Sequence, residues 1–137
     1  MPGPLRTAPF VDIGCGDGRV LREALDAGFP RAVGRELDPD LAKRAEALVG
    51  DAGVVELGDA LATPLPDDAE VVFLNNPFDS PLLARFAPML ADSLRRRPRP
   101  LLVLYLNPRP VEPLLDAGLV LVHVDPRFSV FASGAPS

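Results

Sequence analysis

Residues 10–19 read Phe10-Val11-Asp12-Ile13-Gly14-Cys15-Gly16-Asp17-Gly18-Arg19, and this stretch decides the fold of the chain. Its apolar start predicts a buried strand, its alternate glycines predict a tight turn, and the residues that follow predict a helix. Because the three glycines lack Cβ atoms, a bound ligand can lie almost against the main chain there. The exposed amides at the start of the helix favour a polar or anionic ligand group. We therefore expect the glycine turn, residues 14–18, to form the floor of a binding site.

The spacing of the glycines helps to separate one class of ligand from another. A dinucleotide-binding turn has the pattern G-x-G-x-x-G, whereas this chain has D-x-G-x-G-x-G, with Asp12 two residues before Gly14. A carboxylate at the end of the strand suits a ligand with an ammonium group better than one with only a pyrophosphate. Cys15, inside the turn, is expected to pack as a small apolar residue.

The composition is that of one folded domain. The chain has 137 residues, of which 47% are hydrophobic, enough for a single core. Its longest apolar runs, such as Leu101–Leu106, have the length of a strand and are too short to span a bilayer. The first residues lack the basic and apolar regions of a signal peptide. Because Cys15 is the only cysteine, the sequence excludes an internal disulfide and a multi-cysteine zinc site. We therefore expect a cytoplasmic protein without a metal.

The charge of the chain argues against nucleic acid as a partner. The formal net charge is −5, which does not suit a protein that grips nucleic acid mainly through phosphates. One local run is basic, Arg95-Arg96-Arg97-Pro98-Arg99. We interpret it as the cationic end of a helix that a proline stops, because the helix dipole favours basic residues there.

Strand and helix patterns alternate along the chain with short connections. Strands are predicted at residues 8–13, 31–37, 54–57, 71–74, 101–106, 119–124 and 128–131, and helices at 19–27, 39–49, 79–97 and 111–117. The proline-rich, acidic segment 61–68 is predicted to be a loop where a longer chain would carry another helix. The last two strands form a hairpin by their short connection. The pattern predicts an α/β fold: a seven-stranded, mostly parallel sheet with helices on both faces and an antiparallel C-terminal hairpin.

Acidic residues stand at the ends of the second and third predicted strands, where an open parallel sheet binds its ligands. Glu36 lies 18 residues after Gly18, and an acid there can accept hydrogen bonds from both hydroxyls of a ribose. A solvated strand-end acid is the alternative. Asp59 can accept a hydrogen bond from an exocyclic amino group such as that of adenine. With Asp12, these residues describe a nucleoside that carries an amino-acid-like tail.

In these residues the chain resembles the class I S-adenosylmethionine-dependent methyltransferases, and the resemblance covers nearly the whole sequence. Residues 11–18 match the glycine motif of that family, and Glu36 matches its ribose-binding acid. Asp59 and Ala60 match its adenine-contacting pair. The resemblance implies a Rossmann-like fold and S-adenosylmethionine as cofactor, with S-adenosylhomocysteine as product. It implies a cofactor site of the following residues: Asp12, Gly14, Cys15, Gly16, Gly18, Glu36, Leu37, Asp59, Ala60 and Asn75.

The fourth predicted strand ends in Asn75-Asn76-Pro77-Phe78, which looks like the Asn-Pro-Pro-Tyr/Phe motif of methyltransferases that act on nitrogen. In that motif the Asn side chain and a main-chain carbonyl accept hydrogen bonds from the target amine, and the aromatic ring packs on the substrate. Nitrogen methylation needs orientation and a free lone pair more than a strong base. Here the second position is Asn76 where the motif has proline, so either Asn75 or Asn76 is the functional amide. The alternative is a strand-end cap followed by a proline that starts a helix.

The resemblance therefore implies four catalytic candidates, Asn75, Asn76, Pro77 and Phe78, and an amine acceptor on a small molecule or a protein. A likeness to small bacterial methyltransferases rests on residues 76–79 and 105–108, among others, and brings no substrate with it. The sequence leaves two other functions open, a nicotinamide-dependent oxidoreductase and a non-catalytic cofactor-binding subunit. Only about seven residues precede the first strand, so we expect no N-terminal lid helix. We expect an open cleft, or one that a second copy or a partner subunit covers.

Overall fold

The computed structural model describes residues 8–75, 82–106, 112–124 and 128–133. Their elements are β1 (Phe10–Ile13), α1 (Arg19–Asp26), β2 (Ala32–Glu36), α2 (Pro39–Val49), a 3-10 turn (Gly50–Ala52), β3 (Gly53–Leu57), β4 (Val71–Asn75), α3 (Leu82–Arg96), β5 (Leu102–Leu106), α4 (Glu112–Asp116), β6 (Leu119–Val124) and β7 (Phe128–Ser133). None of the described helices is long and apolar enough to cross a membrane.

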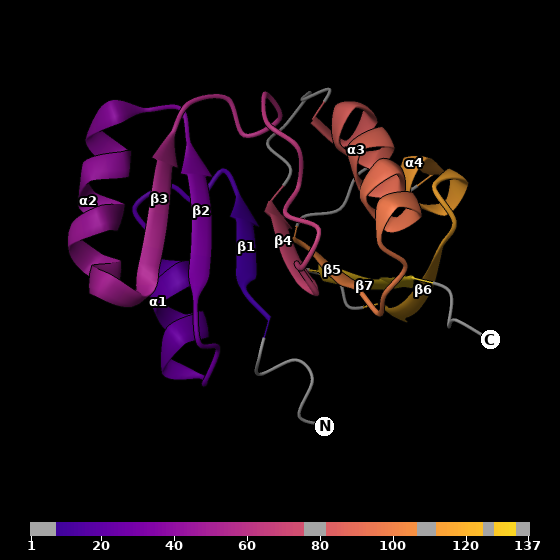
Figure 1. The fold of residues 1–137 in the computed structure, drawn as a ribbon, viewed down its shortest axis with the longest axis horizontal. Coiled ribbons are helices and arrows are strands. Elements are labelled where there is room, and N and C mark those ends of the chain that lie inside the picture. The colour runs from indigo at the N-terminus through magenta and orange to yellow at the C-terminus, as the bar shows by residue number, and fades with distance from the viewer. Residues whose placement is uncertain (1–7, 76–81, 107–111, 125–127, 134–137) are drawn as a thin grey trace.

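The strands form one twisted sheet in the order β3-β2-β1-β4-β5-β7-β6 (Figure 1). The pairs from β3 through β5 are parallel. β7 lies between β5 and β6 and is antiparallel to both. The predicted fold, a mostly parallel seven-stranded sheet with an antiparallel C-terminal pair, is confirmed.

Buried side chains form two clusters, because successive residues of a strand point to opposite faces of the sheet. In β1, Phe10 packs with residues of α1 and α2, whereas Val11 and Ile13 pack with residues of α3 and α4. Figure 1 shows α1 and α2 beside β1, β2 and β3, and α3 and α4 over the other half of the sheet. Helices therefore cover both faces, as predicted.

Local boundaries agree with the sequence patterns to within a few residues. The Asp38 side chain accepts hydrogen bonds from the amides of Asp40 and Leu41 at the start of α2, so it is the N-cap of this helix. The expected start of α3, residues 79–81, lies outside the described residues. Residues 58–70 contain no helix or strand, as the loop prediction required. α3 continues past Pro88, as the predicted helix over residues 79–97 required. The 3-10 turn before β3 was not predicted.

The edge strand β6 carries apolar side chains on its exposed positions. Val120, Val122 and Val124 are each more than half exposed. His123 is also exposed and stacks on Phe128, with ring centroids 5.3 Å apart. This histidine therefore lies at an edge of the sheet, away from the strand ends that carry the glycine turn, Glu36 and Asp59.

Candidate functional site

The glycine turn joins β1 to α1 at the carboxyl edge of the sheet. Gly14, Gly16 and Gly18 have φ values of +79°, +57° and +90°. These values lie in the left-handed region, which residues other than glycine rarely adopt. The amides of Gly14 and Cys15 donate to the carbonyl oxygen of Arg35 in β2, at 3.0 and 2.9 Å. The turn is thus fixed from the neighbouring strand.

Gly18 is the glycine for which close packing adds to the backbone requirement. A Cβ atom there would lie 2.8 Å from Cα of Ala45 in α2, whereas a Cβ on Gly14 or Gly16 would meet nothing within 4 Å. The N-terminus of α1 therefore approaches α2 through a position that only glycine fits.

Gly18→Ala is expected to lower the free energy of unfolding by roughly 3 kcal/mol, because left-handed strain adds to the overlap with Ala45. Gly16→Ala is the matched control, since it introduces strain without an overlap and should cost about 1 kcal/mol. Urea unfolding followed by circular dichroism measures both variants. Equal losses in the two proteins would contradict the packing argument.

Asp12 is a buried carboxyl group that faces the side of the sheet covered by α1 and α2. The residue is 2% exposed, and within the described part of the chain its Oδ1 atom has no hydrogen-bond partner. Burial, with a further contribution from the negative charge of Glu36, raises the pKa of Asp12 to about 7. A buried acceptor without a donor is costly, so this position fits a ligand that brings a cationic donor.

Glu36 ends β2 beside the glycine turn. Its Oε1 atom accepts a hydrogen bond from the amide of Gly16 at 2.7 Å, and its Oε2 atom accepts one from the amide of Asp38 at 2.9 Å. Each carboxylate oxygen keeps a second lone pair. The side chain is therefore held in one orientation and can still accept hydrogen bonds from two hydroxyl groups.

Asp59 follows β3 and is exposed. Its carboxylate accepts from the amide of Leu61 at 2.9 Å and forms an ion pair with Arg85 of α3 at 3.0 Å. These contacts, the Leu61 amide first, hold the pKa of Asp59 below its ordinary value. Leu37, after β2, is 70% exposed at the same edge of the sheet. Leu37 and the ionised Asp59 thus lie at the ends of neighbouring strands. This combination suits an aromatic base with an amino group, because the base can pack on Leu37 and its amino group can donate to Asp59.

Cys15 is buried and packs beneath Gly34, where an added Cβ would lie 2.7 Å from its Sγ atom. Burial, with smaller contributions from nearby carboxylates, raises the pKa of the Cys15 thiol to about 12. The thiol is therefore neutral at ordinary pH and has no nucleophilic character. It packs as a small apolar side chain, as predicted.

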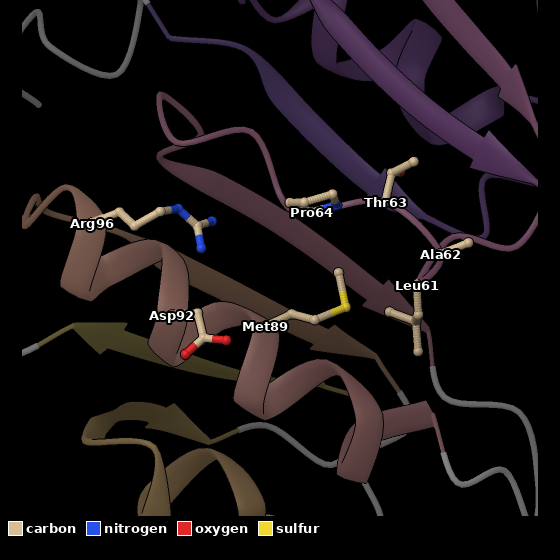
Figure 2. Close-up of a pocket in the computed structure, with 7 residues that line it drawn as sticks. All are labelled: Leu61, Ala62, Thr63, Pro64, Met89, Asp92 and Arg96. Atoms are coloured by element: carbon tan, nitrogen blue, oxygen red, sulfur yellow. The ribbon is translucent and has the colours of Figure 1, made fainter.

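Two pockets flank the segment that follows Asp59. One of about 220 Å³ lies between residues 61–64 and α3, with Met89, Asp92 and Arg96 on the helix side (Figure 2). The other, of about 160 Å³, lies toward β2 and β3 and has Arg35, Glu56 and Asp59 in its wall. Ala62 and Thr63 line both pockets. The segment that carries Asp59 therefore lies between two pockets, and contacts with neighbouring elements are needed to hold it in place.

The structure brings together most of the residues that the sequence predicted for the cofactor site. Asp12, the glycine turn, Glu36 and Leu37 lie at the ends of adjacent strands, and Asp59 and Ala60 follow the next one. Asn75 ends β4, beside β1, and pairs in register with Leu106. Asn76, Pro77 and Phe78 lie outside the described residues, so their predicted roles stay predictions.

Sequence reasoning missed two arginines at this site. Arg85 pairs with Asp59, and Arg35 is a buried cation at the end of β2. The signal available for Arg35 was its place directly before Glu36 in the second predicted strand. The interpretation of residues 95–99 was correct for the end of α3 and incomplete for Arg99, which is buried and donates to main-chain carbonyls.

A mostly parallel open sheet with a glycine turn after β1 and acids after β2 and β3 is the architecture of class I methyltransferases, and this class is what the fold and site define. A family model described as a methyltransferase domain matches residues 11–80, about half of the chain. The chain belongs to this family.

Solved structures show the same fold. An S-adenosylmethionine-dependent methyltransferase from Mesorhizobium loti has a TM-score of 0.68 at 14% identity, over 96% of this chain and 92% of that one. An RNA methyltransferase from Salinibacter ruber, in complex with S-adenosyl-L-homocysteine, has a TM-score of 0.61 at 23% identity, over 92% and 79% of the two chains.

A comparison by sequence gives a match over a short stretch of the chain. A lysine N-methyltransferase from Rattus norvegicus, named for its action on ATP synthase, is 62% identical over 34 residues. The match covers 25% of this chain and 15% of the rat protein.

Proposed function

We propose that this chain is an S-adenosylmethionine-dependent methyltransferase that transfers the methyl group to a nitrogen of a small molecule or of a protein side chain. The observation that carries the proposal is the buried Asp12 carboxyl beside the glycine turn, because its Oδ1 atom finds no donor among the described residues. The ammonium group of the cofactor is a donor with the required charge.

The remaining residues fit the other parts of the cofactor. The glycine turn lets the amino-acid tail lie against the main chain. Glu36, held by the amides of Gly16 and Asp38, accepts from the ribose hydroxyls. Asp59 accepts from the adenine amino group with its remaining lone pairs, Ala60 contacts the ring, and the exposed Leu37 packs against the nucleoside. When bound, the cofactor supplies a methyl group on a positively charged sulfur.

Two observations support nitrogen as the acceptor. Residues 75–78 look like the motif of nitrogen methyltransferases, and the rat protein with the short match is named a lysine N-methyltransferase. Oxygen acceptors at the end of β4 would orient an amine and stabilise the positive charge that grows on its nitrogen. A lysine side chain and a small-molecule amine both meet this requirement.

The proposed acceptor class can be tested with labelled S-adenosylmethionine and a panel of amines, lysine-containing peptides and metabolite extracts. Wild-type protein should label at least one amine. Asn75→Ala and Asn76→Ala each remove one candidate amide, so at least one of them should lower the rate by about tenfold to a thousandfold, the range for loss of one oriented polar group. Full activity in both variants would contradict nitrogen recognition by this motif.

A further inference from the structure

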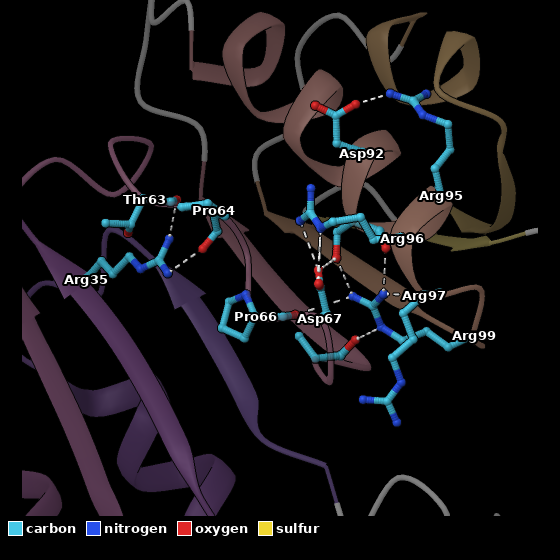
Figure 3. A network of polar contacts seen from close by, with 12 residues as sticks. Arg35, Thr63, Pro64, Pro66, Asp67, Asp92, Arg95, Arg96, Arg97 and Arg99 are labelled. Carbon is cyan, nitrogen blue, oxygen red and sulfur yellow. Dashed lines mark hydrogen bonds and ion pairs between the residues drawn. The ribbon is translucent and has the colours of Figure 1, made fainter.

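Arg35, near the carboxyl end of β2, is held by several side-chain hydrogen bonds. It is 5% exposed, although it belongs to the residue type that is almost never buried without partners. Its Nε atom pairs with Glu56 of β3 at 3.1 Å. Its Nη1 atom donates to the carbonyls of Ala60 and Thr63, both at 3.0 Å. Its Nη2 atom donates to the carbonyl of Pro64 at 2.8 Å, and Figure 3 shows the contacts with Thr63 and Pro64.

The carbonyls that Arg35 binds belong to a segment with little support of its own. Residues 58–70 have no helix or strand, so their buried carbonyls need donors from elsewhere. Within the first part of this segment, the amide of Ala62 bonds back to Asp59 at 3.0 Å. One guanidinium group thus replaces the hydrogen bonds that a helix would supply, and it does so directly after Asp59.

The main chain of Arg35 holds the other side of the site. Its carbonyl oxygen accepts from the amides of Gly14 and Cys15. Arg35 therefore contacts both parts of the site. Its backbone carbonyl binds the glycine turn, and its side chain binds the segment that carries Asp59 and Ala60. Glu36 follows Arg35 in β2, and Asp12 of β1 pairs with Gly34, the residue before Arg35.

We infer that Arg35 is a positioning residue that sets the adenine-binding segment, residues 59–64, relative to the glycine turn; this inference rests on the proposed cofactor site. Arg35 acts through Asp59 and Ala60 and contacts no part of the cofactor itself. Loss of the guanidinium donors of Arg35 displaces Asp59, the acceptor for the adenine amino group. The contacts that Asp12 and the glycine turn make with the amino-acid tail remain.

Arg99 supplies the matched control, because it is a second buried arginine that holds the far end of the same segment. Its donors reach the carbonyls of Ala69, Arg97 and Ser93, at 2.7, 2.9 and 3.2 Å, and the Ser93 hydroxyl at 2.9 Å (Figure 3). Arg99 Nη2 also donates to the carbonyl of Pro66 at 3.4 Å. These partners lie between residue 66 and β4 and at the end of α3, away from Asp59. Arg99→Lys should therefore lower the melting temperature without changing adenine recognition.

The test compares wild type, Arg35→Lys and Arg99→Lys by calorimetric titration with S-adenosylhomocysteine and with S-inosylhomocysteine, in which a carbonyl replaces the adenine amino group. Lysine keeps the charge but cannot reproduce the planar fork. Arg35→Lys should raise the Kd for S-adenosylhomocysteine about tenfold and abolish most of the preference over S-inosylhomocysteine. Arg99→Lys should leave the Kd and the preference within about twofold of wild type. Hydrogen exchange at Leu61 and Ala62 should accelerate in Arg35→Lys alone.

Each outcome has one interpretation. If wild type binds S-adenosylhomocysteine and Arg35→Lys keeps both its affinity and its preference, the positioning role is overturned and the proposed function stands. If folded wild type does not bind near-millimolar S-adenosylhomocysteine, the proposed function fails, and the positioning role fails with it. Should Arg35→Lys not fold, Glu56→Ala replaces it, because Glu56 is the half-exposed partner that orients Arg35 Nε. Glu56→Ala should reduce the preference about threefold, and an unchanged preference overturns the inference.

Discussion

Asp12→Asn is expected to weaken S-adenosylhomocysteine binding by at least about 30-fold, and calorimetric titration at pH 8 measures the loss. The substitution keeps the shape of the side chain and removes the charge that would meet the ammonium group in a buried position. Removing one partner of a buried, hydrogen-bonded charge pair costs about 2–5 kcal/mol, and about 2 kcal/mol already corresponds to 30-fold in affinity.

Asp17→Asn is the matched control for that experiment. Asp17 lies in the glycine turn that follows β1, and its substitution removes the same charge, but the Asp17 carboxylate is partly exposed and pairs with Arg19 at 3.0 Å. We expect the affinity of this variant to stay within about threefold of wild type, because an exposed pair contributes little. Wild-type affinity in Asp12→Asn, or equal losses in the two variants, would contradict a specific role for the buried carboxyl.

The stability of the ligand-free protein is expected to fall as the pH rises from about 4 to about 7. Burial raises the pKa of Asp12 from an ordinary 3.8 to about 7, so the folded protein binds a proton in this window that the unfolded chain has released. The free energy of unfolding therefore decreases with pH there, by at most about 4 kcal/mol for this group.

Urea unfolding of wild type and Asp12→Asn between pH 5 and pH 8 isolates this contribution, since the other titrating groups are common to both proteins. The stability of the variant relative to wild type should increase with pH and level off above about pH 7. Parallel profiles would show that Asp12 titrates normally. The same shift implies that binding of a cationic group near pH 7 releases a proton, which calorimetry in buffers of different ionisation enthalpy detects.

Local sequence patterns predicted the elements well, because the information they need is local. The alternation of apolar residues and the positions of glycine and proline predicted where the strands and helices lie. Asp38 stands at the start of α2. The glycine turn, Glu36 and Asp59 were predictable as one site because the carboxyl ends of parallel strands meet at one edge. Their spacing required no knowledge of side-chain packing.

The sequence did not predict the tertiary contacts of the buried polar side chains. The sequence assigned no role to Arg35 and placed Arg99 in the cationic end of a helix, and only the folded chain shows that each side chain is buried and donates to carbonyls of residues 60–69. The burial of Asp12, whose Oδ1 atom finds no donor in the part of the chain that the structure describes, likewise depends on which face of β1 it occupies and what covers that face. The position of β7 between β5 and β6 is a pairing choice between distant segments, which no local pattern specifies.

That pairing order constrains how the chain can be assembled during synthesis. β6 joins the sheet only through β7, so the ribosome releases β6 before its place in the sheet exists. Until Phe128–Ser133 has emerged, the open edge of β5 and the apolar side chains of β6 have no partner strand. Long-range pairing of this kind is slow and leaves strand edges open to aggregation. The parallel half of the sheet can therefore form before β7 joins β6 to β5.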